Sequence, residues 1–166
     1  MHYLYRKTQG TPPGECSEFL SRCSVGQFAV SPFRLRAKGE RIGVKAALGR
    51  LYFWLVSFGG CRIWYLRHGS QVVHTSCVVP RCCKFPFLKK DEYEIGPCVT
   101  QEAYRSRGIY QYMLRCITAS QPDAVFYMIV RSTNEPSVRG IEKAGFQRCG
   151  TVVRSRFLKN YHKENG

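Results

Sequence analysis

Apolar and polar positions form the clearest pattern between residues 61 and 79. The segments CRIWYLR (61–67) and QVVHTSCVV (71–79) are rich in β-branched and aromatic residues. His68, Gly69 and Ser70 stand between them, a composition typical of a tight turn. The pattern predicts a β-hairpin, and the basic segment PRCCKFPFLKK (80–90), with two prolines, is expected to be a loop after it.

A third strand is predicted over residues 91–100, DEYEIGPCVT. Gly96 and Pro97 interrupt this strand. Because proline has no amide hydrogen to donate to a neighbouring strand, the pair indicates a bulge or a point where the strand opens away from its neighbour.

The second half of the chain alternates between helical and strand patterns. Apolar residues at 109, 110, 113, 114 and 117 have the spacing of a helix over 109–119. The continuous apolar run AVFYMIV (124–130) is typical of a strand covered on both faces. A second helix is expected to begin near Asn134, with Pro136 in its first turn and Gly145 at its end. Residues 150–162 are predicted to form a last strand, which completes an α/β domain.

The first 60 residues show weaker patterns. Proline and glycine predict a loop over 8–15, Ser17 is expected to cap a short helix, and residues 38–58 suit a second helix. No internal repeat or low-complexity linker divides the 166 residues, which are the size of one domain. We therefore expect a single domain over 1–166.

Composition excludes several classes of protein. No run approaches the roughly 18 apolar residues that span a membrane, and the N-terminal MHYLYRKTQG lacks the order of a secretory signal. Nine cysteines are scattered without a CxxC pair. This spacing does not suit a metal site and favours reduced thiols. We expect a cytoplasmic protein without metal or membrane contact.

The net charge of +15 is unusual, and it arises because the chain has 26 Lys and Arg residues but 11 Asp and Glu residues. Such a field attracts anions such as nucleic acid, acidic lipid headgroups or phosphorylated small molecules. The basic residues are spread along the chain, which argues against a disordered nucleic-acid-binding arm.

One turn combines this charge with a glycine. The segment QEAYRSRG (101–108) leads from the third strand into the helix at Ile109. The amides of residues 107–110 would then lie unpaired at a helix N-terminus, where they attract an anion. Gly108 allows a close approach of the backbone, and Arg105 and Arg107 add donors suited to a pyrophosphate. Neither GxxxxGK[ST] nor GxGxxG occurs, and a basic surface turn is the alternative.

The wider pattern resembles the GNAT superfamily of acetyl-CoA-dependent N-acetyltransferases. The resemblance covers residues 91–157. It rests on two motifs: Tyr104, Arg105, Gly108 and Ile109, and then Asn134, Ser137, Glu142, Lys143, Gly145 and Phe146. The segment IGPCVT followed by RSRGIY is similar to the sequences of bacterial members found with surface-polysaccharide genes. The resemblance implies an α/β (α+β) fold with a mainly antiparallel central sheet, flanked by helices, whose splayed strand pair binds acyl-CoA.

The resemblance also implies the cofactor site and its substrate. Acetyl-CoA would be the acyl donor, and no metal is implied. The pyrophosphate would bind Arg105, Ser106, Arg107, Gly108, Ile109 and Tyr110, and the pantetheine arm would pair with Cys98, Val99 and Thr100. Asn134 and Ser137 match positions that contact the cofactor or brace the splay, with a helix cap as the alternative. The family has Gly or Ala at position 110, so we expect the Tyr110 side chain to point away from the ligand.

Catalysis would be direct attack of a primary amine on the thioester, assisted by a base. Glu94 is the first candidate, and by alternation it would share a face with Gly96, Cys98 and Thr100. His74 is a second candidate, with a structural histidine as the alternative. An amide of Val99 or Thr100 would hold the oxyanion. Ile141 stands where many members have a proton-donating tyrosine, which leaves Tyr127 and Tyr161 as substitutes. Cys98 is a further candidate nucleophile.

Two functions therefore stay open. The first is an N-acetyltransferase with residues 1–60 on the acceptor side, acting on a small amine. An anionic acceptor, such as an amino sugar or a nucleotide-linked sugar, would use the excess charge, and a homodimer is allowed. The second is a non-catalytic module that binds acyl-CoA or, through its basic surface, nucleic acid.

Overall fold

The computed structural model describes residues 1–10, 17–155 and 160–163. Within these residues eight strands form one sheet in the order β2-β3-β4-β5-β6-β1-β7-β8. Neighbouring strands are antiparallel, and β5 and β6 are the parallel pair. The mixed, mainly antiparallel architecture expected from the sequence is confirmed. The strands are β1 (His2–Lys7), β2 (Cys23–Ala29), β3 (Arg62–His68), β4 (Gln71–Pro80), β5 (Glu92–Thr100), β6 (Val125–Arg131), β7 (Gln147–Arg154) and β8 (Tyr161–Lys163).

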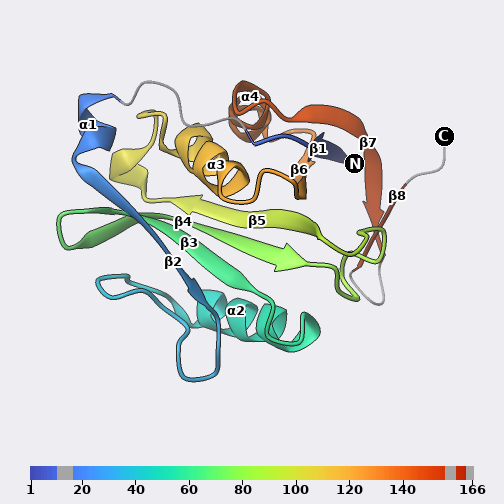
Figure 1. Cartoon of the computed structure of the whole chain (residues 1–166), viewed down its shortest axis with the longest axis horizontal. Coiled ribbons are helices and arrows are strands. Elements are labelled where there is room, and N and C mark those ends of the chain that lie inside the picture. Colours follow the sequence, from blue (N-terminus) through green and yellow to red (C-terminus); the bar gives the residue numbers. More distant parts are fainter. Residues whose placement is uncertain (11–16, 156–159, 164–166) are drawn as a thin grey trace.

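Helices cover both faces of this sheet (Figure 1). Helices α3 and α4 lie on one face, and α2 lies on the other. The helical segments are α1 (Glu18–Ser21), α2 (Val44–Val56), the 3₁₀ turn η1 (Glu102–Tyr104), α3 (Ile109–Ala119) and α4 (Glu135–Lys143). The predicted helices in the second half of the chain are therefore present.

Local sequence explains where two of these helices begin and end. The side chain of Ser17 accepts a hydrogen bond from the amide of Leu20 at the start of α1. At the start of α4 the side chain of Asn134 accepts a hydrogen bond from the amide of Ser137, and Pro136 occupies the first turn. Gly145 follows α4 with a φ of 87°, the left-handed conformation that ends many helices.

One prediction about strands needs correction, and two strands were not predicted. The strands β1 and β2 lie in the N-terminal part, where the sequence pattern indicated a loop and two helices but no strand. The last predicted strand, 150–162, is two strands instead, because β7 begins at Gln147 and ends at Arg154 and β8 begins at Tyr161. Residues 156–159 of that prediction, and residues 11–15 of the predicted loop over 8–15, lie outside the described residues.

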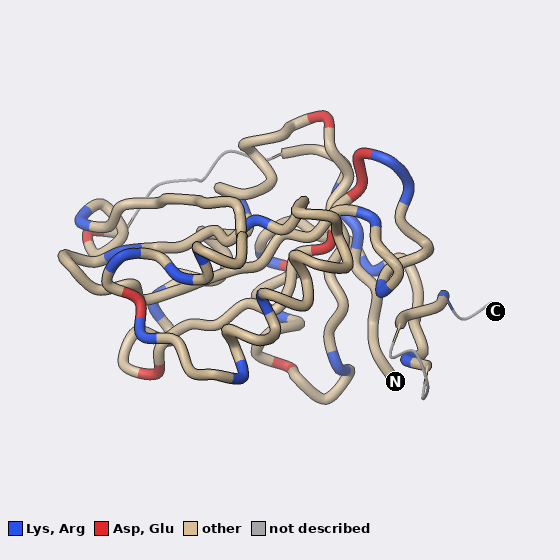
Figure 2. The backbone as a smooth tube through the Cα atoms, turned by 90° about the horizontal axis from the view of Figure 1, so that it is seen from below, with Lys and Arg blue, Asp and Glu red and all other residues tan. Residues whose placement is uncertain are grey.

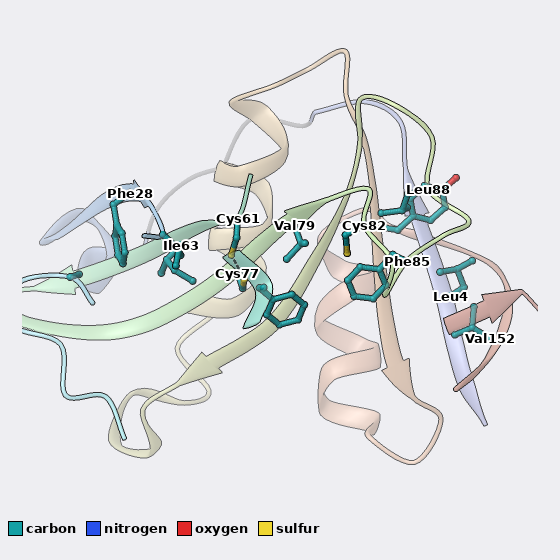
Figure 3. Packing of buried hydrophobic residues seen from close by; sticks show 14 of the residues in the cluster. Leu4, Phe28, Cys61, Ile63, Cys77, Val79, Cys82, Phe85, Leu88 and Val152 are labelled. Carbon is teal, nitrogen blue, oxygen red and sulfur yellow. Dashed lines mark hydrogen bonds between the residues drawn. The ribbon is translucent and has the colours of Figure 1, made fainter. Parts of the chain in front are cut away.

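The core on the α2 side contains several thiols (Figure 3). Cys61, Cys77 and Cys82 are buried there beside Val79 and Phe85. The sulfur atoms of Cys61 and Cys77 are 3.1 Å apart, and both cysteines are free. On the other face Leu114 and Ile117 of α3 and Ile141 of α4 pack on the sheet, among other buried residues.

The pairing of β5 creates an opening in the sheet. β5 pairs with β6 only from Glu92 to Glu94, whereas it stays paired with β4 as far as Thr100. Opposite Gly96 and Pro97 the register with β4 shifts between Ser76 and Val78. The bulge and the opening predicted from these two residues are both present, and the opening lies beside the start of α3.

Candidate functional site

The turn from β5 into α3 presents main-chain amides at the opening of the sheet. Ser106 and Gly108 have φ angles of 62° and 73°, so the chain turns sharply before the helix. The first bond within α3 runs from the amide of Tyr112 to the carbonyl of Gly108 at 3.0 Å. The preceding amides of α3 therefore have no partner within the helix and carry partial positive charge.

The free edge of β5 faces the same opening. The amide of Gln101 donates to the carbonyl of Val73 on β4 at 2.9 Å. By strand alternation the amide of Val99 also faces β4, and those of Cys98 and Thr100 point to the side from which β6 has separated. Of the two oxyanion donors considered from the sequence, Thr100 has the suitable direction.

These two features line a cleft of about 950 Å³ between α3, α4 and β5, which we call the α3–α4 cleft. Its side chains are mainly polar or basic, and it holds most of the cofactor residues expected from the sequence. It is lined by Cys98, Val99, Thr100, Tyr104, Arg105, Ser106, Gly108, Ile109, Tyr110, Gln111, Asn134, Pro136, Ser137, Arg139, Gly140 and Lys143.

The α3–α4 cleft carries positive charge. Arg105, Arg139 and Lys143 line it, and its lining within the described chain includes no Asp or Glu. Arg139 pairs with exposed Glu135 at 3.3 Å. Arg139 was not predicted from the sequence, and Lys143 was named only as part of the second motif, although their spacing of four places them on one face of a helix.

Arg107 lies differently from the other arginine of this turn. Its guanidinium is over the rings of Phe19 and Tyr104, at 5.0 and 5.7 Å from their centres. It lines a separate hollow beside α1 and is absent from the lining of the α3–α4 cleft. Only the main chain of Arg107 therefore stays close to the expected anion site.

Glu94 occupies an unexpected face of the sheet. It pairs with Val79 of the α2-side core, whereas Cys98 packs with the cluster on the α3 side. The prediction that these two side chains share a face is wrong, because the register shift at Gly96 and Pro97 reverses the alternation. Burial raises the pKa of Glu94 to about 8, and nearby Lys84 opposes this rise. Its Oε2 is buried without a hydrogen-bond partner.

His74 is held in a neutral state. Its Nδ1 is 2.7 Å from Thr100 Oγ1, and its Nε2 is 2.8 Å from Ser76 Oγ. Burial lowers the pKa of His74 to about 3. With both ring nitrogens engaged, His74 has the surroundings of a structural histidine.

Cys98 and Tyr127, two further candidate catalytic residues, differ in their surroundings. Burial raises the pKa of Cys98 to about 12, so its thiol is neutral at physiological pH and a poor nucleophile. Tyr127 packs against Phe87 and lies below Lys163, with 5.8 Å between ring centres and 5.7 Å to the ammonium. Tyr127 is absent from the lining of the α3–α4 cleft.

A second hollow, which we call the α2 pocket, lies on the opposite face of β5. It has a volume of about 400 Å³ between α2, the loop before it and strands β3 to β5. Pro97 and Val99 of β5 and Gln101, which follows β5, line it, and Val99 also lines the α3–α4 cleft. The two hollows therefore meet across one strand.

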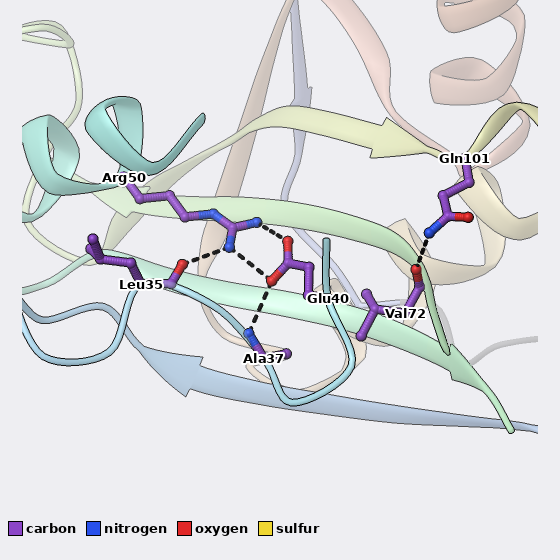
Figure 4. Close-up of polar contacts among 6 residues, drawn as sticks. All are labelled: Leu35, Ala37, Glu40, Arg50, Val72 and Gln101. Carbon is purple, nitrogen blue, oxygen red and sulfur yellow. Dashed lines mark hydrogen bonds and ion pairs between the residues drawn. The ribbon is translucent and has the colours of Figure 1, made fainter. Parts of the chain in front are cut away.

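A buried ion pair fixes one wall of the α2 pocket (Figure 4). Arg50 of α2 binds both carboxylate oxygens of Glu40, at 2.5 and 2.9 Å, and donates to the carbonyl of Leu35 at 2.7 Å. Glu40 also accepts from the amide of Ala37 at 2.9 Å. On the facing wall Gln101 donates to the carbonyl of Val72 at 2.5 Å.

Several solved structures with a similar fold are described as acetyltransferases. One, from the GNAT family of Colwellia psychrerythraea, is 14% identical, with a TM-score of 0.57 over 89% of this chain and 52% of that one. A GCN5-related N-acetyltransferase from Sphaerobacter thermophilus is 12% identical, with a TM-score of 0.55 over 89% and 48%. The chain has the GNAT fold. The alanine N-acetyltransferase of a ribosomal protein from Escherichia coli is 13% identical, with a TM-score of 0.53 over 81% and 84%.

The extent of this similarity is limited to the fold. The chain spans about half the length of the first two of these structures. No protein-family model matches the sequence, and no curated protein matches it. The resemblance to the GNAT superfamily is thus confirmed for the architecture, and the link to amino sugars stays a prediction.

Two side chains depart from the usual GNAT pattern. Ile141 is 1% exposed and packs in the core, so the usual tyrosine position holds a buried apolar residue. Tyr110 lines the α3–α4 cleft, and its ring lies against Gly140 of α4, where glycine leaves room for it. The expected direction of this side chain away from the ligand stays a prediction. Burial raises the pKa of Tyr110 above its ordinary value, so its hydroxyl stays protonated.

Two further observations bear on the site. In the described part of the chain, no group of three or more His, Cys, Asp or Glu side chains is arranged to hold a metal ion. No helix among the described residues is long and apolar enough to cross a membrane.

Proposed function

We propose that the protein transfers an acetyl group from acetyl-CoA to a primary amine. The observation that carries this proposal is the α3–α4 cleft, where helix amides, basic side chains and the free edge of β5 face one space. A nucleotide with a pyrophosphate and an amide-rich arm needs those three features together.

Donor binding is assigned to the turn and to β5. The amides of residues 107–110, with Ser106 and the side chain of Arg105, would hold the pyrophosphate. Cys98, Val99 and Thr100 would align the pantetheine arm, whose amides can bond the free strand edge. Asn134 and Ser137 would support the cleft at the start of α4, and Arg139 and Lys143 suit a further phosphate.

The α2 pocket is assigned to the acceptor, since it meets the cleft at Val99. The amine nitrogen would attack the thioester carbon, forming a C–N bond while the C–S bond breaks and the CoA thiolate leaves. The amine must lose a proton, and we assign its removal to Glu94, acting through water from the α2 side of β5. The amide of Cys98, which points into the opening like that of Thr100 and lies next to Pro97, would stabilise the oxyanion, and the protonated hydroxyl of Tyr110 would return a proton to the thiolate.

Two residues favour a second function, the binding of acyl-CoA without catalysis. Ile141 cannot donate a proton, and Glu94 is absent from the lining of both hollows. These observations suit a module that binds acyl-CoA without turnover. Binding of nucleic acid is a weaker alternative, because Lys and Arg are distributed over the whole chain instead of one segment (Figure 2).

Calorimetry with acetyl-CoA, followed by thiol release with a panel of amines, tests the proposal. Binding with amine-dependent thiol release is expected, whereas binding without release would favour the non-catalytic module. The double variant Arg139→Gln/Lys143→Gln should weaken binding about tenfold by loss of charge-assisted contacts. Arg81→Gln/Lys90→Gln changes the net charge equally on exposed residues outside the cleft and serves as the control.

An oligonucleotide titration separates the remaining alternative. Binding of the oligonucleotide at low salt that fades as salt rises, without binding of acetyl-CoA, would favour a nucleic-acid-binding module.

The eight cysteines within the described residues are free. The expectation of a reducing compartment such as the cytoplasm stays a prediction. A homodimer and a bacterial source stay predictions.

A further inference from the structure

The charges around the α2 pocket select against a cationic acceptor. Glu40 is the acidic residue among its described lining residues, and both of its carboxylate oxygens are bound by Arg50. Arg41 and Lys45 also line the pocket, are exposed, and within the described residues form no ion pair. A bound molecule therefore meets two unpaired cations and no available carboxylate.

The two cations lie toward one end of the pocket. Residues 39–41 adjoin the start of β4, because the carbonyl of Gly39 accepts from the amide of Val72 at 3.5 Å. The carbonyl of Val72 in turn accepts from Gln101 at 2.5 Å (Figure 4). Gln101 directly follows β5 and is four residues from Pro97, roughly 13 Å at about 3.3 Å per residue. The opening where β5 leaves β6, and where the thioester is proposed to lie, is at the Pro97 end.

The space between these ends is mainly apolar, although Thr75 and His74, whose ring nitrogens are already engaged, also line the pocket. Ile42, Phe53, Ile63, Val72, Pro97 and Val99 contribute to it. A polyhydroxylated body such as a sugar would leave several hydroxyls there without partners, which is unfavourable. A hydrocarbon segment would lose no hydrogen bonds in the same place.

We infer that the acceptor is a small, elongated primary amine with an apolar middle and a carboxylate at the end opposite the amine. The amine lies at the Pro97 end, beside the thioester, and the carboxylate lies between Arg41 and Lys45. This inference rests on the proposed function and specifies its acceptor. It keeps the anionic character expected from the net charge and replaces the sugar with a hydrocarbon body.

Three amines with six carbon atoms each test this inference, because they differ at the end opposite the reacting amine. 6-Aminohexanoate carries a carboxylate, hexylamine a methyl group and 1,6-diaminohexane an ammonium group. We expect kcat/KM with acetyl-CoA to fall in that order at low salt, by about tenfold from the acid to the diamine. Equal or faster acetylation of hexylamine or the diamine overturns the inference.

The double variant Arg41→Gln/Lys45→Gln identifies the residues responsible. It should lower kcat/KM for 6-aminohexanoate about fivefold to tenfold and leave that for hexylamine within about twofold. Arg81→Gln/Lys90→Gln again controls for net charge. An equal loss for both amines in the pocket variant, or an equal effect of the control variant, contradicts the assignment.

Calorimetry with 6-aminohexanoate and hexylamine alone separates the two proposals. If acetyl-CoA fails to bind, the proposed function fails, but preferential binding of the acid that depends on Arg41 and Lys45 still supports the pocket. If acetyl-CoA binds and the acid is neither bound nor acetylated, the acceptor inference fails while the donor site stands.

Discussion

The ring of Tyr110 lies against Gly140 so closely that a Cβ atom at position 140 would be 2.6 Å from Cδ1 of the tyrosine. Tyr110 is in the first turn of α3, and Gly140 is inside α4. The glycine lacks the side chain that would otherwise fill this space. The pair therefore explains how a large residue occupies the start of α3, where a GNAT protein usually has a small one, without separating α3 from α4.

Gly140→Ala should consequently destabilise the protein, although alanine favours helices by about 1 kcal/mol over glycine. Overpacking against Tyr110 is expected to outweigh this gain, with a net loss of about 1–2 kcal/mol in the free energy of unfolding. Gly49→Ala in α2 is the matched control, because an added Cβ there meets nothing within 4 Å. It should stabilise the protein by about 0.5–1 kcal/mol. Urea denaturation measures both, and a gain for Gly140→Ala would contradict the proposed packing.

Gly108→Leu should weaken acetyl-CoA binding at least tenfold. The side chain would enter the anion site from a backbone with a φ of 73°, and the left-handed conformation costs about 1–2 kcal/mol for a residue with a Cβ. Gly69→Leu in the turn between β3 and β4 is the control, since Gly69 also has a positive φ, 57°, and open space around it. Both variants should lose similar stability by thermal denaturation. Calorimetry should show the binding loss only for Gly108→Leu, and unchanged binding there would refute the assigned loop.

Glu94→Gln should lower kcat much more than it lowers affinity for acetyl-CoA. General-base catalysis contributes about 10²–10⁴-fold to rates, so we expect a loss within that range. The amide has nearly the same shape as the carboxyl group and does not remove a proton. Steady-state kinetics and calorimetry separate the two effects, and full activity of the variant would eliminate Glu94 as the base.

The same variant should change how stability depends on pH. The pKa of Glu94 is about 8 in the folded protein, above its ordinary value of 4.5. Between these values the folded state binds a proton that the unfolded chain lacks, so stability falls as pH rises, by up to about 1.4 kcal/mol per unit. His74 has the opposite effect, because its pKa is lowered from 6.5 to about 3 in the folded protein. Below pH 6.5 the unfolded chain therefore binds a proton that the folded state lacks, and stability falls as pH falls. The difference between wild type and Glu94→Gln from pH 5 to 9 isolates Glu94, and parallel curves would contradict its burial as an acid.

Arg50→Met should reduce the free energy of unfolding by about 3–5 kcal/mol, because it leaves the buried carboxylate of Glu40 without its partner. The side chains of this pair are only 10% and 8% exposed. Arg22→Met removes a comparable contact to Glu18 in which both side chains are more than half exposed, and should cost less than about 1 kcal/mol. Chemical denaturation compares the two. A small effect of Arg50→Met would show that the wall of the α2 pocket does not depend on this ion pair.

The sequence alone determined the elements whose pattern is local. The helix at 109–119, the cap at Asn134 and the hairpin over 61–79 follow from contacts between residues a few positions apart, and each lies where predicted. The interruption at Gly96 and Pro97 predicted the opening of the sheet for a similar reason, since a missing amide hydrogen is a property of one residue. The basic glycine turn was recognised because a helix start follows it directly.

Only the tertiary structure decided features that depend on distant pairing. β1 inserts between β6 and β7, whose paired residues are at least 119 positions away, so no local pattern identifies its place. The face of Glu94 depends on the register shift between β4 and β5, and a shift of one residue moves a side chain to the opposite face. The α2 pocket joins residues 40–53 to three strands, and its unpaired charges became visible only when Glu40 was found bound to Arg50. Local patterns determine each element, whereas the register between elements determines which side chains share a site.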